Sequence, residues 1–332
     1  MEKSTNTLSI YTSRHRLCPS PVWVMVRKEI SGHIRSWKFI VLLVLILLTY
    51  WGSLLVSMSD LRSITSSIKD PESLFIYLKL LTHTNGSLPP FHVFMSFLGP
   101  LLGISLGFDA INSEKQNGTL NRILAQPVYR DNLLLSKFVG VWILVGALML
   151  TLTLLMIGTG TILTGIIIEM EELWRILTHA LISVFYIGLW LAIAILLSVV
   201  FHQPATSALT AIAIWLFFTV FYEVIINLAV KAMIPDNPLQ ASAQYEIYQL
   251  AFNFLRLAPS QLYTDATTTL LMPSVRSLGP VTMDQMAGAI PTNLPFKESL
   301  MIVWSEVSGL IAATFVCFAL AYYKFMRREI RT

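Results

Sequence analysis

Two carboxylates stand alone in long apolar runs of this chain. Glu223 is the only charged residue in 205–230, and Glu306 is the only one in 299–323. A lone carboxylate in hydrocarbon is costly, so each side chain should face a cavity, another polar group or a neighbouring helix. Two interpretations follow: the acids line the outer part of a solute path or gate, or they form hydrogen bonds that pack helices. The residues alone favour neither interpretation.

Other residues that could do covalent or metal chemistry form no recognisable site. The segment Glu171-Glu172-Leu173-Trp174-Arg175 is similar to the Glu-Glu-x-x-x-Arg motif of intramembrane CAAX-type proteases, but its spacing is one residue shorter. The sequence has no His-Glu-x-x-His motif, and its six histidines lack the spacing typical of metal ligands. We therefore expect no catalytic residue, no bound metal and no cofactor on this chain.

The composition identifies the environment of these residues. Hydrophobic residues make up 55% of the 332 residues and charged residues only 13%, whereas soluble domains have about 25% charged residues. The apolar residues cluster in runs of roughly 18 or more, the length needed to cross a bilayer. The chain is therefore predicted to be an all-α polytopic membrane protein with six spanning helices, at about 39–58, 91–108, 138–157, 179–201, 205–230 and 299–323.

The charges that flank these runs predict how the helices are oriented. With the amino terminus in the cytoplasm, the inner segments hold 15 of the 23 Lys and Arg residues but only 6 of the 19 Asp and Glu residues. Because cytoplasmic loops are enriched in Lys and Arg, we expect a multi-pass protein of the cell membrane with both termini in the cytoplasm. The chain then divides into a cytoplasmic arm (1–38), a six-helix transmembrane domain (39–323) and a cytoplasmic tail (324–332).

Two segments outside the spans have helical patterns of their own. In the arm, apolar residues recur at helical spacing from Val22 to Ile30 beside basic residues, which predicts an amphipathic helix along the inner leaflet. The extracytoplasmic stretch 231–298 contains seven of the 15 prolines, so no single helix can fill it. Residues 247–255 predict a second amphipathic helix, either on the outer membrane surface or packed on the helix ends.

The second span carries a face of small residues. Gly99, Gly103 and Gly107 recur every four residues along it. Small residues at this spacing let two helices approach closely, and packing within the subunit is favoured over contact with another copy.

The connection between the second and third spans, 109–130, is longer than a simple loop needs. Gly118 can end a first short helix in the left-handed conformation, Thr119 can cap a second helix, and Pro127 ends that one. The segment is thus predicted to form a compact helix–turn–helix elbow beneath the membrane. Such an elbow is expected to dock a partner.

The elbow and the arm together resemble the ABC-2 type transporter permease family. The resemblance extends to the six-helix layout and to the long outer segment before the last helix. It is carried by Asp109, Glu114, Gly118-Thr119-Leu120, Leu124, Pro127-Val128, Arg130 and Lys137, and by Arg27-Lys28-Glu29-Ile30, Arg35 and Phe39 before the first span.

The resemblance implies the transmembrane subunit of an ATP-driven exporter. Two copies would pair as a homodimer in the bilayer, bind two separate ATP-binding subunits and move a substrate by alternating access. ATP and Mg²⁺ would be bound by those subunits, because this sequence contains no Gly-x-x-x-x-Gly-Lys-Ser/Thr loop. Glu114 and Arg122 are the charged residues expected to dock the partner. The full set expected at the coupling elbow is Asp109, Glu114, Gly118, Thr119, Arg122, Pro127 and Arg130.

Two other functions compete with this interpretation. An ion- or proton-coupled transporter or channel would use Glu223 and Glu306, but the sequence lacks the inverted repeat common in such proteins and the elbow would be unexplained. An intramembrane enzyme would need a catalytic constellation, and none was found above. Nucleic acid is not an expected partner, because proximity to the membrane explains the inner basic residues.

Overall fold

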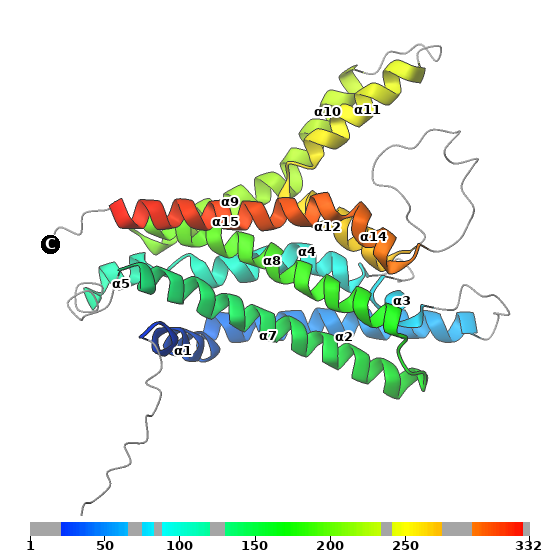
Figure 1. Ribbon diagram of the computed structural model, residues 1–332, viewed down its shortest axis with the longest axis horizontal. Helices are drawn as coiled ribbons and strands as arrows, with labels where there is room; N and C mark the ends of the chain where they lie inside the picture. The colour runs from blue at the N-terminus through cyan, green and yellow to red at the C-terminus, as the bar shows by residue number, and fades with distance from the viewer. Residues whose placement is uncertain are drawn as a thin grey trace, which may run out of the picture.

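The structure, a computed structural model, describes residues 21–65, 75–82, 88–119, 130–233, 241–273 and 294–327. All the regular structure in these ranges is helical, and they contain no strand. The all-α prediction is therefore confirmed, and most of the long helices run roughly parallel in one elongated bundle (Figure 1).

Six helical segments in the described part of the chain are long and apolar enough to cross a membrane. Each of them overlaps one of the predicted runs, so the prediction of six spans is confirmed. They are built from α2 (Trp37–Thr65), α4 (Phe91–Gly107), α7 (Arg130–Thr164), α8 (Met170–Val200), the continuous run α9 (Pro204–Leu216), η2 (Phe217–Phe221) and α10 (Tyr222–Met233), and finally α15 (Trp304–Arg327). The sixth span begins at Trp304 rather than at 299, because a separate short helix, α14 (Phe296–Ile302), precedes it.

Helix α8 lies at the centre of the bundle and packs against α4, α7 and α15. The three glycines of α4 lie against it. A Cβ atom on Gly103 would stand 2.6 Å from the carbonyl oxygen of Ile187, and one on Gly107 would stand 2.9 Å from the Cβ of Ala194. Because these distances are shorter than van der Waals contact, the glycines allow α4 and α8 to approach more closely than larger residues would.

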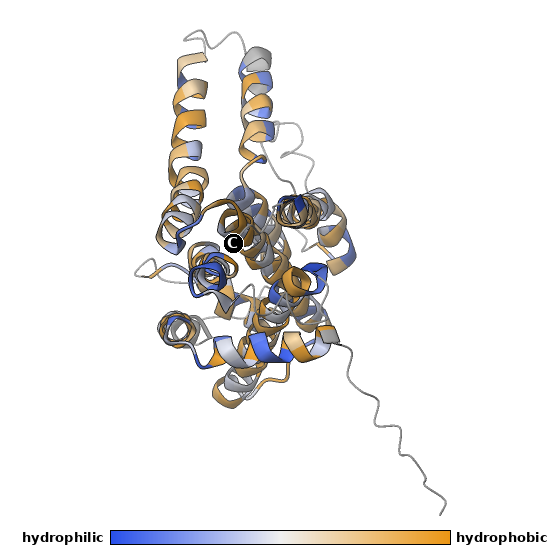
Figure 2. Ribbon diagram, turned by 90° about the vertical axis from the view of Figure 1, so that its left-hand side faces the viewer, coloured by the Kyte–Doolittle hydropathy of each residue, from blue (hydrophilic) through white to orange (hydrophobic). Residues whose placement is uncertain are grey.

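The arm before the first span contains α1 (Pro21–Ile34). This helix lies across one end of the bundle, roughly at right angles to the spans (Figures 1 and 2). Val26 is buried against the bundle, while Arg27 and Lys28 are exposed. At Gly140 of α7, a Cβ atom would stand 3.1 Å from the Cβ of Glu29, so α1 is seated closely on α7.

The fifth span leaves the bundle. Beyond η2, α10 continues into a hairpin with α11 (Ala241–Leu255) that stands away from the other helices (Figures 1 and 2). The Tyr222 hydroxyl donates a hydrogen bond to the carbonyl oxygen of Phe254 at 2.8 Å, which joins the two helices near the base of the hairpin. The predicted amphipathic helix at 247–255 is thus part of α11, and it packs against α10.

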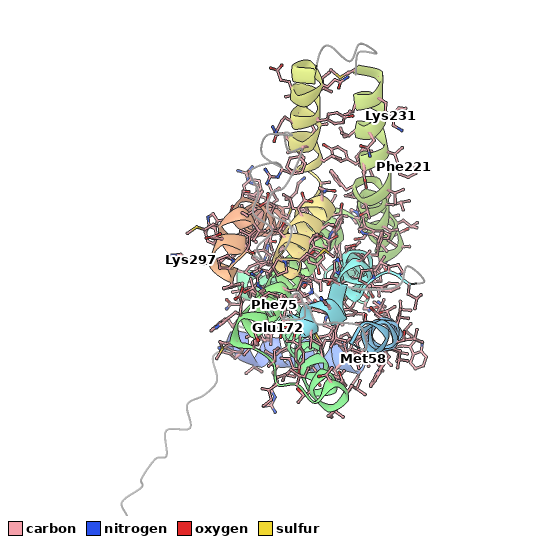
Figure 3. The ribbon with its side chains drawn as sticks, turned by 90° about the vertical axis from the view of Figure 1, so that its right-hand side faces the viewer. Met58, Phe75, Glu172, Phe221, Lys231 and Lys297 are labelled. Atoms are coloured by element: carbon pink, nitrogen blue, oxygen red, sulfur yellow. The ribbon has the colours of Figure 1, made fainter. Side chains whose placement is uncertain are left out.

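The chain returns to the bundle after the hairpin. Helix α12 (Pro259–Leu271) packs on α8 and α15, and the short helices α3 (Ile76–Thr82) and α14 (Phe296–Ile302) lie at the same end. This is the end opposite α1, where Phe75 and Glu172 lie near the middle and Lys297 lies at the rim (Figure 3). The two ends of the bundle therefore carry different polar structures, and each is described below.

Candidate functional site

The elbow after α4 begins with a short helix that is tied to the central helix of the bundle. Helix α5 (Asn112–Gln116) follows a single turn, and its first backbone N–H groups would lack partners within the helix. The hydroxyl of Ser198, near the end of α8, accepts hydrogen bonds from the N–H groups of Ile111 at 3.0 Å and Asn112 at 3.2 Å. The start of α5 is therefore held by α8.

Helix α5 ends just before Gly118, as predicted, whereas the second helix that Thr119 was predicted to cap lies outside the described residues. Gly118 has a φ of +66°, the left-handed conformation that glycine adopts without strain. The Thr119 hydroxyl donates a hydrogen bond back to the carbonyl oxygen of Glu114 at 3.1 Å. Residues from Lys115 to Thr119 are exposed, so this end of the elbow presents a free surface beneath the bundle.

A buried lysine joins the elbow to two other helices. The Nζ atom of Lys137, on α7, lies 2.7 Å from Oε1 of Glu114 on α5 and 3.2 Å from Oε1 of Glu29 on α1. Its side chain is only 6% exposed, against 16% for Glu114 and 15% for Glu29. A buried ammonium group is tolerated only when it is paired, and two carboxylates provide that pairing here. Three segments far apart in sequence are thus held at one point.

A second ion pair lies closer to solvent. Lys38, at the start of α2, pairs with Asp109, just after α4, and its Nζ lies 4.4 Å from the centroid of the Phe108 ring. The side chains of Lys38 and Asp109 are 48% and 27% exposed, so this pair stabilises the structure much less than a buried one.

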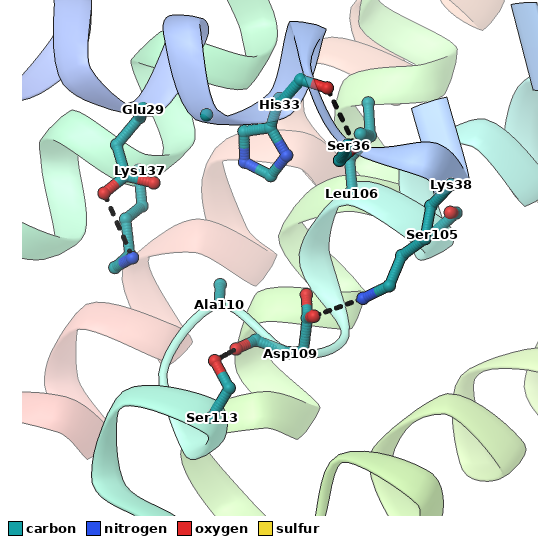
Figure 4. Close-up of a pocket in the computed structure, with 11 residues that line it drawn as sticks. Glu29, His33, Ser36, Lys38, Ser105, Leu106, Asp109, Ala110, Ser113 and Lys137 are labelled. Carbon is teal, nitrogen blue, oxygen red and sulfur yellow. Dashed lines mark hydrogen bonds and ion pairs between the residues drawn. The ribbon is translucent and has the colours of Figure 1, made fainter. Parts of the chain in front are cut away.

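The cluster around Lys137 and the Lys38–Asp109 pair flank a pocket between α1, the start of α2 and the elbow (Figure 4). Its volume is about 240 Å³, and the His33 ring of α1 points into it. Burial lowers the pKa of His33 below its usual value near 6.5, while Glu29 and Asp109 act in the opposite direction. His33 is therefore mainly neutral at pH 7.

The structure places the predicted elbow residues in different surroundings. Asp109 and Glu114 line or adjoin the pocket, and Arg130 is exposed at the first residue of α7. Glu114 faces inward toward Lys137 rather than outward. Arg122 and Pro127 lie outside the described residues.

The partners of the elbow carboxylates were not recognised from the sequence. Glu29 and Lys137 belong to the stretches that carried the family resemblance, but nothing in those stretches showed that the two side chains meet. One feature of the sequence could have indicated the other pair. Lys38 and Asp109 are the charged residues that directly border two apolar runs, so both lie at the ends of spans.

The opposite end of the bundle holds a second buried cation that sequence reasoning also missed. Arg175 of α8 is fully buried and donates to the carbonyl oxygens of Leu270 at 2.9 Å and Leu294 at 2.5 Å, and to the Ser299 hydroxyl at 3.1 Å. It also pairs with Glu171 at 2.9 Å. The segment that resembled a protease motif therefore ties α8 to α12 and α14.

Glu172, in the same segment of α8, contacts α3. Its Oε1 accepts a hydrogen bond from the backbone N–H of Tyr77 at 2.9 Å. Together with Arg175, it attaches α3, α12 and α14 to one turn of α8.

The two intramembrane acids lie in different surroundings. Glu306 of α15 is fully buried, forms an ion pair with Arg256 just after α11, and accepts a hydrogen bond from the Ser305 hydroxyl at 2.8 Å. Glu223 is exposed on α10, in the hairpin that stands away from the bundle. The structure thus joins Glu306 to Arg256 rather than to Glu223.

Known proteins resemble this chain along most of its length. A family model described as "ABC-2 family transporter protein" matches residues 23–330. The "Probable ABC transporter permease protein NosY" of Stutzerimonas stutzeri is 25% identical over 214 residues, 62% of this chain and 69% of that protein. The protein of the same name from Pseudomonas aeruginosa is 26% identical over 211 residues, 61% of this chain and 68% of that protein. The chain therefore belongs to the ABC-2 transporter family, as a multi-pass transmembrane permease component.

Proposed function

We propose that this permease exports its substrate by alternating access, driven by separate ATP-binding subunits that dock at the elbow. ATP and Mg²⁺ are bound on those subunits, and this chain contributes no covalent step. The observation that carries the proposal is the attachment of α5. Lys137 and Ser198 connect this short helix to α1, α7 and α8, so a push on the exposed residues 115–119 is transmitted to three helices.

In this proposal Glu114 acts from within the elbow. Its carboxylate is engaged by Lys137, so the partner's contact surface is the exposed end of α5 and the turn after it. Glu114 then determines how firmly the elbow is connected to the spans. Loss of the ion pair would weaken coupling even where the partner still binds.

The proposed orientation places the elbow, the arm and both termini in the cytoplasm. It rests on the excess of Lys and Arg in the segments at this end of the bundle. ATP-binding subunits in the cytoplasm would then meet the elbow directly.

We propose that two copies of the permease form the complex. Only 6% of the span Pro204–Met233 is buried in a single subunit, against 67% of the central span Met170–Val200. Most of the surface of the fifth span is thus left for contact with lipid and with a second copy.

Charge reversal at Glu114 tests the coupling proposal. In Glu114→Lys, Lys137 would face a like charge across the former 2.7 Å contact, and the elbow would be displaced from α7. We expect ATPase activity of the reconstituted complex to lose its dependence on transported substrate. Glu298→Lys, an exposed reversal at the opposite end, is the matched control. Unchanged ATPase-subunit binding and unchanged transport in Glu114→Lys would contradict the proposal.

A further inference from the structure

We propose that the pocket between α1, the start of α2 and the elbow binds the headgroup of a zwitterionic phospholipid that carries a primary amine. The occupant is a lipid of the surrounding leaflet, with its phosphate toward Lys38 and His33 and its amine toward Asp109. This inference concerns the lipid around the permease and stands independently of the docking of an ATPase.

The pocket lies at the level of lipid headgroups. Lys38 directly precedes the charge-free run 39–58, and Asp109 directly follows the charge-free run 91–108. Their ion pair therefore marks the edge of the hydrocarbon layer. Trp23 and Trp37, which flank the pocket in sequence, are 58% and 77% exposed, as expected of aromatic side chains in the interfacial region.

The lining offers groups for both ends of such a headgroup. Among the described residues, neither the His33 imidazole nor the Ser105 hydroxyl has a hydrogen-bond partner, and both line the pocket. They can donate to a phosphate together with the Lys38 ammonium, which is half exposed. The carboxylates of Asp109 and Glu29 have a second oxygen each, which can accept from an ammonium group.

The charge of the cluster selects the class of headgroup. The cluster contains three acids, Glu29, Asp109 and Glu114, and two lysines, Lys38 and Lys137. It therefore has one uncompensated negative charge while His33 is neutral. A purely anionic headgroup would add to that excess. A primary amine compensates it and donates hydrogen bonds, which a quaternary choline cannot do.

The size of the pocket agrees with this occupant. A volume of about 240 Å³ holds several water molecules, each needing at least ~10–15 Å³. It is therefore large enough for a phosphate with a short amine. Exposure of Lys38 and Asp109 shows that the pocket is not sealed from its surroundings.

Retention of lipid by the purified full-length permease tests the proposal. The protein is equilibrated in mixed micelles containing phosphatidylethanolamine, phosphatidylglycerol and phosphatidylcholine with matched acyl chains, and bound lipid is counted by native mass spectrometry. We expect preferential retention of phosphatidylethanolamine. Asp109→Asn removes the charged acceptor of the amine and should reduce that preference by about tenfold. Lys38→Gln removes a phosphate contact that the three lipids share and should reduce the retention of all of them.

Three controls separate the pocket from other causes. Lys28→Gln on the exposed face of α1 and Glu298→Gln at the opposite end should retain the wild-type preference. The side chain of Ala110 points into the pocket (Figure 4). The substitution Ala110→Leu therefore fills the pocket without removing an ion pair and should abolish the preferential retention of phosphatidylethanolamine. This variant keeps the test valid where loss of the Lys38–Asp109 pair impairs folding.

Three outcomes would overturn the proposal. Equal retention of the three lipids by the wild-type protein would show no selection for a primary amine. Undiminished preference in folded Ala110→Leu would place the lipid elsewhere. If water-soluble glycerophosphoethanolamine bound as tightly as phosphatidylethanolamine, the pocket would be a site for soluble amines rather than for membrane lipid.

Discussion

Lys137 is an ammonium group that needs both of its carboxylate partners. Removing a buried cation leaves the opposite charges without compensation, which costs about 3–5 kcal/mol in proteins generally. We predict that Lys137→Met lowers the free energy of unfolding by an amount of this order, because Glu29 and Glu114 are left unpaired. The unfolding midpoint of the detergent-solubilised protein measures the effect.

Lys38→Met is the matched comparison. The Lys38–Asp109 pair is substantially exposed, and exposed pairs contribute about 0–1 kcal/mol. Equal destabilisation by the two substitutions would show that Lys137 is not buried among its partners as described.

His33 predicts a dependence of stability on pH. Burial holds its pKa below the usual value near 6.5, so the folded state binds the proton less readily than the unfolded state. The stabilising contribution of the neutral ring is present above pH 6.5 and is lost as the pH falls below that value. We predict a smaller loss of thermal stability between pH 7.5 and 5.5 in His33→Gln than in the wild-type protein. Parallel curves for the two proteins would contradict this assignment.

At the residue scale, sequence motifs identified residues but not which of them pair. Asp109 and Glu114 were selected because they stand in a recognisable elbow. The pairing was not predictable, since Lys38 is 71 residues from Asp109 and Lys137, the partner of Glu114, also binds Glu29, 108 residues away. Local spacing carries no information about which distant side chains meet once helices pack.

At the scale of elements, the contact between α4 and α8 depends on the absence of side-chain atoms. A Cβ atom on Gly103 would overlap the backbone of Ile187 at 2.6 Å, and a backbone atom in a packed helix cannot move cheaply. We predict that Gly103→Ala destabilises the protein by about 1–3 kcal/mol, the usual cost of overpacking. Thermal unfolding in detergent measures it.

Gly146→Ala is the control for this prediction. Gly146 lies within α7 with nothing inside 4 Å of a Cβ atom, so alanine there should be neutral or stabilising by about 0.5–1 kcal/mol. Equal effects of the two substitutions would mean that α4 and α8 are not in close contact.

Arg175 holds α12 and α14 to α8. Lysine cannot reproduce its several hydrogen bonds, so Arg175→Lys should leave the carbonyl groups of Leu270 and Leu294 without partners. We predict faster amide hydrogen exchange in 259–271 and 296–302, with Arg27→Lys on the exposed face of α1 as control. A change confined to the residues of α8 around Arg175 would contradict this role.

The spans were predictable because apolar length alone defines them. The path of the fifth span was not. The periodicity in 247–255 predicted an amphipathic helix but could not distinguish a membrane surface from a neighbouring helix, since both present an apolar face. Its pairing with α10, marked by the Tyr222–Phe254 hydrogen bond, is a tertiary property.

At the scale of the whole molecule, sparse charge is concentrated at the two ends of the bundle. One end has the elbow, α1 and the cluster around Lys137, and the other has the cluster around Arg175. The resemblance to ABC-2 permeases rested on the first of these ends and is confirmed by the match over residues 23–330. None of the motifs that carried the resemblance lies at the second end, so the interactions of Arg175 were found only in the structure.

Photo-crosslinking from the elbow tests the central claim most directly. A photoreactive amino acid is introduced at Lys115 or Asn117, which are exposed on the elbow, and at Lys297, which is exposed at the opposite end. Irradiation in membranes, followed by mass spectrometry of the products, identifies whatever lies against each position. We predict that Lys115 and Asn117 crosslink to a protein with an ATP-binding phosphate loop and that Lys297 does not. Crosslinks to such a protein from Lys297 alone, or from none of the three positions in a complex active in ATP-driven transport, would contradict the account.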